Sequence, residues 1–154
     1  MRYTFFFFIL LVLSACAGAP VGPPVEIEAP PSDKAQVYLI RPRTLIGAGN
    51  LQITAINGSV VAQLQVGQYT VVPVEPGTTI LTFRERIQAP LPLLDLRLLQ
   101  ELGGFSEIGR VNLNAGQSAF MEYYWMKFVD KDEASRLLGG GVEYVPPVGP
   151  AGRP

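Results

Sequence analysis

Histidine is absent from the 154-residue chain, which removes the most common general base and the most common metal ligand of proteins. Cys16 is the single cysteine, so no disulfide can form within the chain. An excess of basic charge is also missing, because 12 lysines and arginines stand against 13 aspartates and glutamates. Nucleic-acid-binding proteins carry a basic face, so the composition argues against a nucleic-acid partner.

The motifs of common enzyme classes are missing as well. The nearest match to a nucleophile elbow, Gly104-Phe105-Ser106-Glu107-Ile108, lacks its second glycine, and the chain has no histidine to activate the serine. Two carboxylate pairs, Glu101 with Glu107 and Glu85 with Glu122, are candidates for acid–base chemistry, but nothing in the sequence brings either pair together. A phosphate-binding glycine loop and a metal-ligand cluster are absent. We therefore expect no catalytic activity, no cofactor and no metal site.

The sequence also lacks a hydrophobic run long enough to cross a bilayer. The run at residues 5–13 has nine apolar residues, whereas a transmembrane helix needs about 20. With Arg2 before it and small residues after it, the run is typical of a signal peptide. It ends in Leu13-Ser14-Ala15-Cys16, which resembles a bacterial lipobox. We expect residues 1–15 to be removed and Cys16 to be lipidated; the alternative is an ordinary secretory signal with an incidental cysteine.

The lipid would determine where the protein is located. One myristoyl-length chain binds a membrane only marginally, at about 0.8 kcal/mol per buried CH₂, but a lipoprotein cysteine carries a diacylglyceryl group and usually a third chain. The residue after Cys16 is Ala17 and not the Asp that retains lipoproteins at the inner membrane of enteric bacteria. We expect an outer-membrane anchor facing the periplasm. Without Arg2, the mature chain has 11 basic and 13 acidic residues and a net charge of −2.

Three segments follow the signal peptide. Residues 16–34 form the lipidated cysteine and a proline-rich linker, residues 35–145 a single domain, and residues 146–154 a flexible tail rich in proline and glycine. At about 3.1 Å per residue, the linker would reach on the order of 50 Å if it were fully extended. A proline-rich docking segment is an alternative, although no PxxP motif has flanking arginines.

Short alternating segments separated by turn residues predict an all-β domain, a single β-sandwich of about seven short strands with a leucine-rich insert and a short C-terminal helix. In the first strand, Val37, Leu39 and Arg41 are expected on one face, with Tyr38 and Ile40 on the other. The predicted strands cover residues 36–41, 51–56, 60–64, 68–74, 79–86, 110–113 and 118–126, with a further strand at 142–145.

The turns carry the clearest local signals. Asn57-Gly58 predicts a type I′ hairpin, because both positions of that turn need a positive φ, and Pro76-Gly77 predicts a type II turn. Asn114-Ala115-Gly116-Gln117 predicts a hairpin between strands 110–113 and 118–126. The spacing of Asp130 and Glu133 matches an aspartate-led capping box, which predicts a short helix with an acidic start that ends at Gly139.

Strand and turn signals follow one another in a particular order across roughly residues 35–138. They are Ala35-Gln36-Val37-Tyr38-Leu39-Ile40-Arg41-Pro42, Ile56-Asn57-Gly58 with Val61 and Leu64, Gly67-Gln68-Tyr69, Pro76-Gly77 and Ala115-Gly116-Gln117. The order resembles that of small bacterial lipoproteins with a domain of unknown function, similar to PEGA-like and carboxypeptidase-regulatory-like β-sandwiches. The resemblance implies a sandwich fold and a lipoprotein setting, and it implies no activity.

The leucine-rich insert, residues 87–107, does not match this pattern. Leu91, Leu94, Leu98 and Leu102 share one face at helical spacing, whereas Asp95-Leu96-Arg97-Leu98 alternates like a strand. We expect either a helix or an extended arm packed over a sheet, or an exposed apolar patch for a partner or for lipid. In the second case Leu94, Leu98 and Leu102 are the contact residues.

The strand predicted at 118–126 is rich in aromatic residues. Alternation places Tyr123 and Trp125 on one face, and Glu122 and Tyr124 on the other. One face must belong to the core, and the other would expose aromatic side chains as a sugar-stacking platform that includes Tyr124 or Trp125. Packing is the alternative use of these side chains.

Taken together, the sequence predicts a lipid-anchored, non-enzymatic interaction or assembly module of the bacterial cell envelope, with an envelope protein as its partner. The alternative is a module that binds a glycan, either peptidoglycan or another surface polysaccharide.

Cross-linking the lipidated protein in its own envelope separates these two functions. If the insert binds a partner, one specific protein is lost when Leu94, Leu98 and Leu102 are changed to Ser, and a Cys16→Ala protein controls for the anchor. Recovery of only polysaccharide, unaffected by the leucine changes, would contradict the assembly function.

Overall fold

The computed structural model describes residues 25–44, 49–87 and 104–149. The predicted signal peptide, Cys16, and the insert leucines Leu94, Leu98 and Leu102 lie outside these ranges. Within the ranges, no helix has the length and apolar character needed to cross a bilayer.

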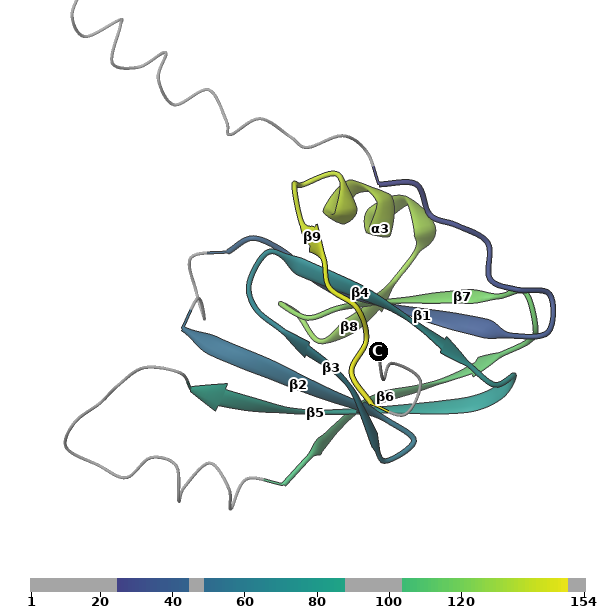
Figure 1. The fold of residues 1–154 in the computed structure, drawn as a ribbon, viewed down its shortest axis with the longest axis horizontal. Coiled ribbons are helices and arrows are strands. Elements are labelled where there is room, and N and C mark those ends of the chain that lie inside the picture. Colours follow the sequence, from purple (N-terminus) through teal and green to yellow (C-terminus); the bar gives the residue numbers. More distant parts are fainter. Residues whose placement is uncertain (1–24, 45–48, 88–103, 150–154) are drawn as a thin grey trace, which may run out of the picture.

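The described chain is mostly β, with two packed sheets and one short helix (Figure 1). The five-stranded sheet has the order β8-β7-β1-β4-β9, and the four-stranded sheet has the order β3-β2-β5-β6. The strands are β1 (Ala35–Arg41), β2 (Asn50–Ile56), β3 (Ser59–Leu64), β4 (Gln68–Val74), β5 (Gly77–Ile87), β6 (Ser106–Leu113), β7 (Ser118–Glu122), β8 (Lys127–Val129) and β9 (Glu143–Tyr144), and the helix is α3 (Lys131–Leu138).

Strand β1 lies at the centre of the five-stranded sheet and is buried along its whole length. Val37 and Leu39 belong to the core cluster that both sheets share. Tyr38 and Ile40 belong to a second cluster on the outer face, where Ala134 of helix α3 covers them. The predicted alternation of the strand is confirmed, but both faces are apolar because the helix forms a third layer.

Two local predictions are confirmed, the Asn57-Gly58 turn and the cap of the helix α3. Asn57 and Gly58 have φ values of 49° and 83°, as a type I′ turn requires. The side chain of Asp130 accepts a hydrogen bond from the Glu133 backbone N–H at 2.8 Å and caps α3, which ends at Gly139. The helix begins at Lys131, directly after the capping residue, so its acidic first turn is as the capping box predicts.

The hairpin predicted around residues 114–117 is wrong. Strand β6 pairs with β5 in one sheet, whereas β7 pairs with β1 in parallel in the other sheet. The turn is tight, with the Gln117 N–H donating to Asn114 O, but it carries the chain between the sheets. The residues of a turn determine that the chain changes direction, but they do not determine which strand the next segment pairs with. Here β7 pairs with the edge of β1 that β4 leaves open, and so provides hydrogen-bond partners for its backbone groups.

The long strand predicted at 118–126 is also wrong. Strand β7 ends at Glu122, residues 123–126 form a turn, and β8 returns antiparallel to β7. Met126 has a φ of 51°, an unusual value for a residue other than glycine. Among the described residues, β8 is the strand that was not predicted, whereas β9 corresponds to the further strand expected at 142–145.

Segments on both sides of the expected domain contact the sheets. Val25 and Ile27 pack on the outer cluster, and Gln36 Nε2 donates to the Glu28 carbonyl at 2.6 Å. After β9, the Val148 N–H donates to Val61 O of β3 at 2.8 Å, so the C-terminal segment connects one edge of each sheet (Figure 1). The packed part of the chain therefore extends beyond residues 35–145 in both directions.

A hydrogen bond between the hydroxyls of Thr54 and Tyr123 joins the two sheets in the core. Both residues are essentially unexposed, at 0% and 1%, and burial raises the pKa of Tyr123 well above its ordinary value. Changing Tyr123→Phe leaves the Thr54 hydroxyl buried without this partner. We expect the free energy of unfolding to fall by about 1–3 kcal/mol, measured by chemical denaturation.

The double variant Thr54→Val with Tyr123→Phe is the control. Because replacing both partners removes the unsatisfied group, its stability should return close to that of the unchanged protein. A double variant less stable than Tyr123→Phe alone would contradict this role of the bond.

Candidate functional site

Residues 123–126, which we call the aromatic turn, expose two large side chains. Trp125 is 69% exposed and Tyr124 is 40% exposed, whereas Tyr123 is buried. The rings of Tyr124 and Trp125 are in edge contact, with their centroids 4.6 Å apart. The turn therefore presents a continuous aromatic surface.

A buried carboxylate fixes the backbone of this turn. Glu122 is 2% exposed, and its Oε1 accepts the Tyr124 N–H at 2.6 Å while its Oε2 accepts the Trp125 N–H at 3.0 Å. Hydrogen bonds to a charged group are stronger than neutral ones. The predicted platform is therefore corrected: Glu122 lies beneath the aromatic pair, and Tyr124 and Trp125 lie side by side, not on opposite faces of a strand.

A polar pocket of about 290 Å³, the end pocket, lies beside the aromatic turn between the ends of the two sheets. Its walls come from β1, β2 and β5, from the chain after β1 and from the turn. The lining residues are Arg41, Pro42, Thr44, Asn50, Gln52, Glu85, Tyr123, Tyr124 and Met126.

Arg41 closes the inner end of this pocket. It is 5% exposed, and its Nη1 donates to the backbone carbonyls of Asn50 at 2.8 Å and Leu64 at 2.7 Å. Burial lowers the pKa of Arg41, and the negative charge of Glu85 opposes that effect. The guanidinium thus connects the end of β1 to the facing sheet.

Hydrogen-bond acceptors dominate the opposite wall. Glu85 is exposed, and its carboxylate accepts from Asn50 Nδ2 at 3.2 Å and from Gln52 Nε2 at 3.4 Å. The remaining oxygen of Gln52, Oε1, is buried and has no hydrogen-bond partner within the described part of the chain. A buried acceptor without a donor is unfavourable by about 1–3 kcal/mol.

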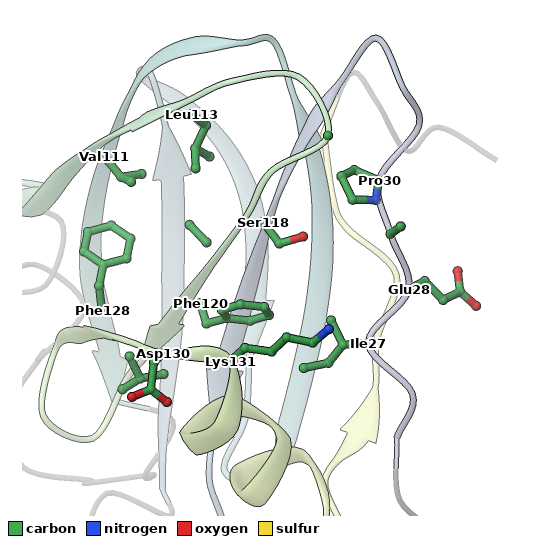
Figure 2. A pocket seen from close by; sticks show the side chains of 14 residues that line it. Ile27, Glu28, Pro30, Val111, Leu113, Ser118, Phe120, Phe128, Asp130 and Lys131 are labelled. Atoms are coloured by element: carbon green, nitrogen blue, oxygen red, sulfur yellow. The ribbon is translucent and has the colours of Figure 1, made fainter.

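A second hollow, the side groove, lies along the edges of β6, β7 and β8 (Figure 2). It has a volume of about 580 Å³, and its most apolar wall holds Val111, Leu113 and Phe128. Residues 27–30 form the facing rim, where the Glu28 carboxylate points away from the hollow (Figure 2). The groove is larger and less polar than the end pocket.

Not all of the predicted site residues can be located. Cys16, Leu94, Leu98 and Leu102 lie outside the described residues, so their roles stay predictions. Within residues 25–44, 49–87 and 104–149, no three carboxylate or cysteine side chains are grouped closely enough to hold a metal ion.

The end pocket was not predicted from the sequence. The available signal was Arg41, which continues the inward-facing series of Val37 and Leu39 and therefore places a charge at the edge of the core. The contributions of Gln52 and Glu85 depend on the pairing of β2 with β5, where these two residues are direct neighbours.

No protein-family model matches the chain, and comparisons with curated proteins and with solved structures find no match either. The resemblance to PEGA-like lipoprotein domains therefore stays a prediction beyond the two-sheet, mostly-β architecture.

Changing Glu122→Gln tests the aromatic turn. A glutamine keeps the size of the side chain but offers one acceptor oxygen, so one of the two turn hydrogen bonds is lost. We expect the unfolding free energy to fall by about 1.5–3 kcal/mol. Because the chain has a single tryptophan, a lower fluorescence anisotropy of Trp125 reports the loosened turn.

Glu143→Gln, an exposed substitution on β9, is the matched control and should leave both readouts unchanged. Unchanged stability and anisotropy in Glu122→Gln would show that the carboxylate does not hold the turn.

Proposed function

We propose that this protein is a lipid-anchored, non-enzymatic binding module of the bacterial cell envelope, and that its ligand is a glycan. The observation that carries the proposal is the exposed pair Tyr124 and Trp125, held by buried Glu122 next to a pocket lined with polar groups. This function is the alternative predicted from the sequence.

The chemistry of the two neighbouring surfaces fits a sugar. A pyranose ring has an apolar C–H face that packs on an aromatic ring, and hydroxyls at its rim that need hydrogen-bond partners. Trp125 and Tyr124 offer the first surface, and Asn50, Gln52 and Glu85 offer the second. Because Glu122 fixes the turn before any ligand binds, little conformational entropy is lost on binding.

The membrane anchor is inferred from Leu13-Ser14-Ala15-Cys16. Since residues 25–30 contact the domain, the segment able to separate the domain from the lipid is residues 17–24. Fully extended, it would span on the order of 30 Å. This supports a module that binds a glycan close to its membrane, on the periplasmic side of the outer membrane.

An assembly module that binds an envelope protein is the second candidate, and the side groove favours it. Strand β8 pairs with β7 only from Phe120 onward, so Ser118 and Ala119 form the edge of their sheet at the groove. An open strand edge can accept an added strand from a partner. In the envelope cross-linking experiment, this candidate predicts one retained protein partner that does not depend on Trp125.

Changing Trp125→Ala tests the glycan function. Sedimentation with insoluble envelope polysaccharide and with purified peptidoglycan measures binding, and we expect about tenfold weaker retention because the stacking surface is lost. Trp125 is exposed, so the unfolding midpoint should barely move.

Tyr144→Ala, which removes a 50% exposed aromatic residue on β9, is the control and should retain full binding. Equal retention of the Trp125→Ala and unchanged proteins, or no retention on either glycan, would contradict the proposal.

A further inference from the structure

We infer that the end pocket binds one neutral pyranose ring through two adjacent free hydroxyls, and that Glu85 selects for this pattern. The inference rests on the proposed glycan function and specifies its ligand. It follows from the hydrogen-bond acceptors in the pocket, the negative charge of Glu85 and the volume of the pocket.

The Glu85 carboxylate has acceptor capacity left over. A carboxylate offers about four lone-pair sites, and the two amide donors, from Asn50 and Gln52, occupy one site on each oxygen, at 3.2 and 3.4 Å. The side chain is exposed at the pocket. Two neighbouring ring hydroxyls have the spacing to donate to the two oxygens of one carboxylate.

Gln52 has a third acceptor atom, which indicates that the ligand carries hydrogen-bond donors. The residue is 4% exposed and lines the pocket, and its Oε1 has no hydrogen-bond partner among the described residues. Exchanging the amide oxygen and nitrogen would not repair this, because the oxygen would then face the Glu85 carboxylate. Because this oxygen is itself buried, the Gln52 amide has to turn toward the pocket before a hydroxyl or N–H group of a ligand can satisfy it.

The charge of the pocket disfavours an acidic sugar. Glu85 lies on the accessible wall, whereas Nη1 of Arg41 is engaged by the carbonyls of Asn50 and Leu64 at the buried end. A uronate carboxylate placed among the acceptors would meet the negative charge of Glu85 before it met the guanidinium. The pocket thus favours a ligand rich in donors and without negative charge.

The volume limits the ligand to one ring in the pocket. About 290 Å³ is at the lower limit of the roughly 300–1,000 Å³ found for drug-sized ligands. Further sugar units of a polysaccharide would continue over Tyr124 and Trp125, at the rim. Interior peptidoglycan units carry an amide at C2 and are linked at C4, so they have no adjacent pair of free hydroxyls; the inferred ligand is therefore a neutral hexose polymer.

Calorimetric titration of the full lipidated protein in detergent micelles tests this selection with four hexasaccharides. Maltohexaose and mannohexaose are neutral and have free adjacent hydroxyls, chitohexaose has acetamido groups at C2, and hexagalacturonate is acidic. We expect maltohexaose or mannohexaose to bind about tenfold or more tightly than chitohexaose and hexagalacturonate. Glu85→Gln should weaken that binding about tenfold and improve the relative affinity for hexagalacturonate at low salt.

Glu75→Gln is the matched control, because Glu75 is an exposed carboxylate that precedes β5, outside the residues that line the end pocket. Its affinities should be unchanged, and the thermal midpoint of each variant establishes that it is folded. The change in selectivity toward the acidic sugar cannot arise from partial unfolding, which would weaken all ligands alike.

Tighter binding of chitohexaose or hexagalacturonate, or no binding of maltohexaose or mannohexaose at millimolar concentration, would overturn the inference. So would unchanged selectivity in Glu85→Gln. The glycan function itself is tested separately in the sedimentation experiment. It would fail if neither envelope polysaccharide nor peptidoglycan retained the protein, or if Trp125→Ala did not weaken retention, so the two failures are distinguishable.

Discussion

The burial of β1 on both faces is the constraint on which the rest of the structure depends. A strand with apolar side chains on both sides needs a layer above and a layer below, and its two backbone edges need neighbours. The four-stranded sheet covers Val37 and Leu39, and helix α3 covers Tyr38 and Ile40. Strands β4 and β7 take the two edges, and β7 reaches its position only because the chain crosses from one sheet to the other at residues 114–117.

The candidate site lies where this buried strand ends. Arg41 occupies the last inward-facing position of β1, and a buried guanidinium needs hydrogen-bond acceptors. The carbonyls of Asn50 and Leu64 provide them and close the core with polar groups. On the neighbouring strand, Glu122 is paired with Ile40 and holds the aromatic turn at the same end of the domain. A polar pocket and an aromatic surface are therefore adjacent because both follow from how β1 ends.

The sequence was informative where structure is decided by neighbouring residues. Asn57-Gly58 specifies its turn through the φ values it allows, and Asp130 caps α3 through a bond to Glu133 three residues away. Strand positions also followed from alternation, as in β1 and β4. The connection between β6 and β7 was beyond such reasoning, because a parallel pair such as β1 with β7 joins residues about 80 positions apart.

The site was predictable in its residue types and not in its geometry. Tyr124 and Trp125 were singled out from composition, but strand alternation placed them on opposite faces. The bend that unites them depends on the carboxylate of Glu122 turning back to its own backbone. The end pocket needs residues from both sheets, so no local pattern of the sequence contains it.

The most direct test of the account is a ¹H–¹⁵N correlation spectrum of the protein titrated with soluble fragments of envelope polysaccharide. Because the chain has one tryptophan, its indole N–H gives one signal that reports the aromatic turn. The account predicts saturable shifts of this signal and of the Asn50 and Gln52 side-chain amides, with no shift at Val111 or Phe128 in the side groove. Shifts confined to the side groove, or none at saturation, would contradict a glycan site at this end of the domain.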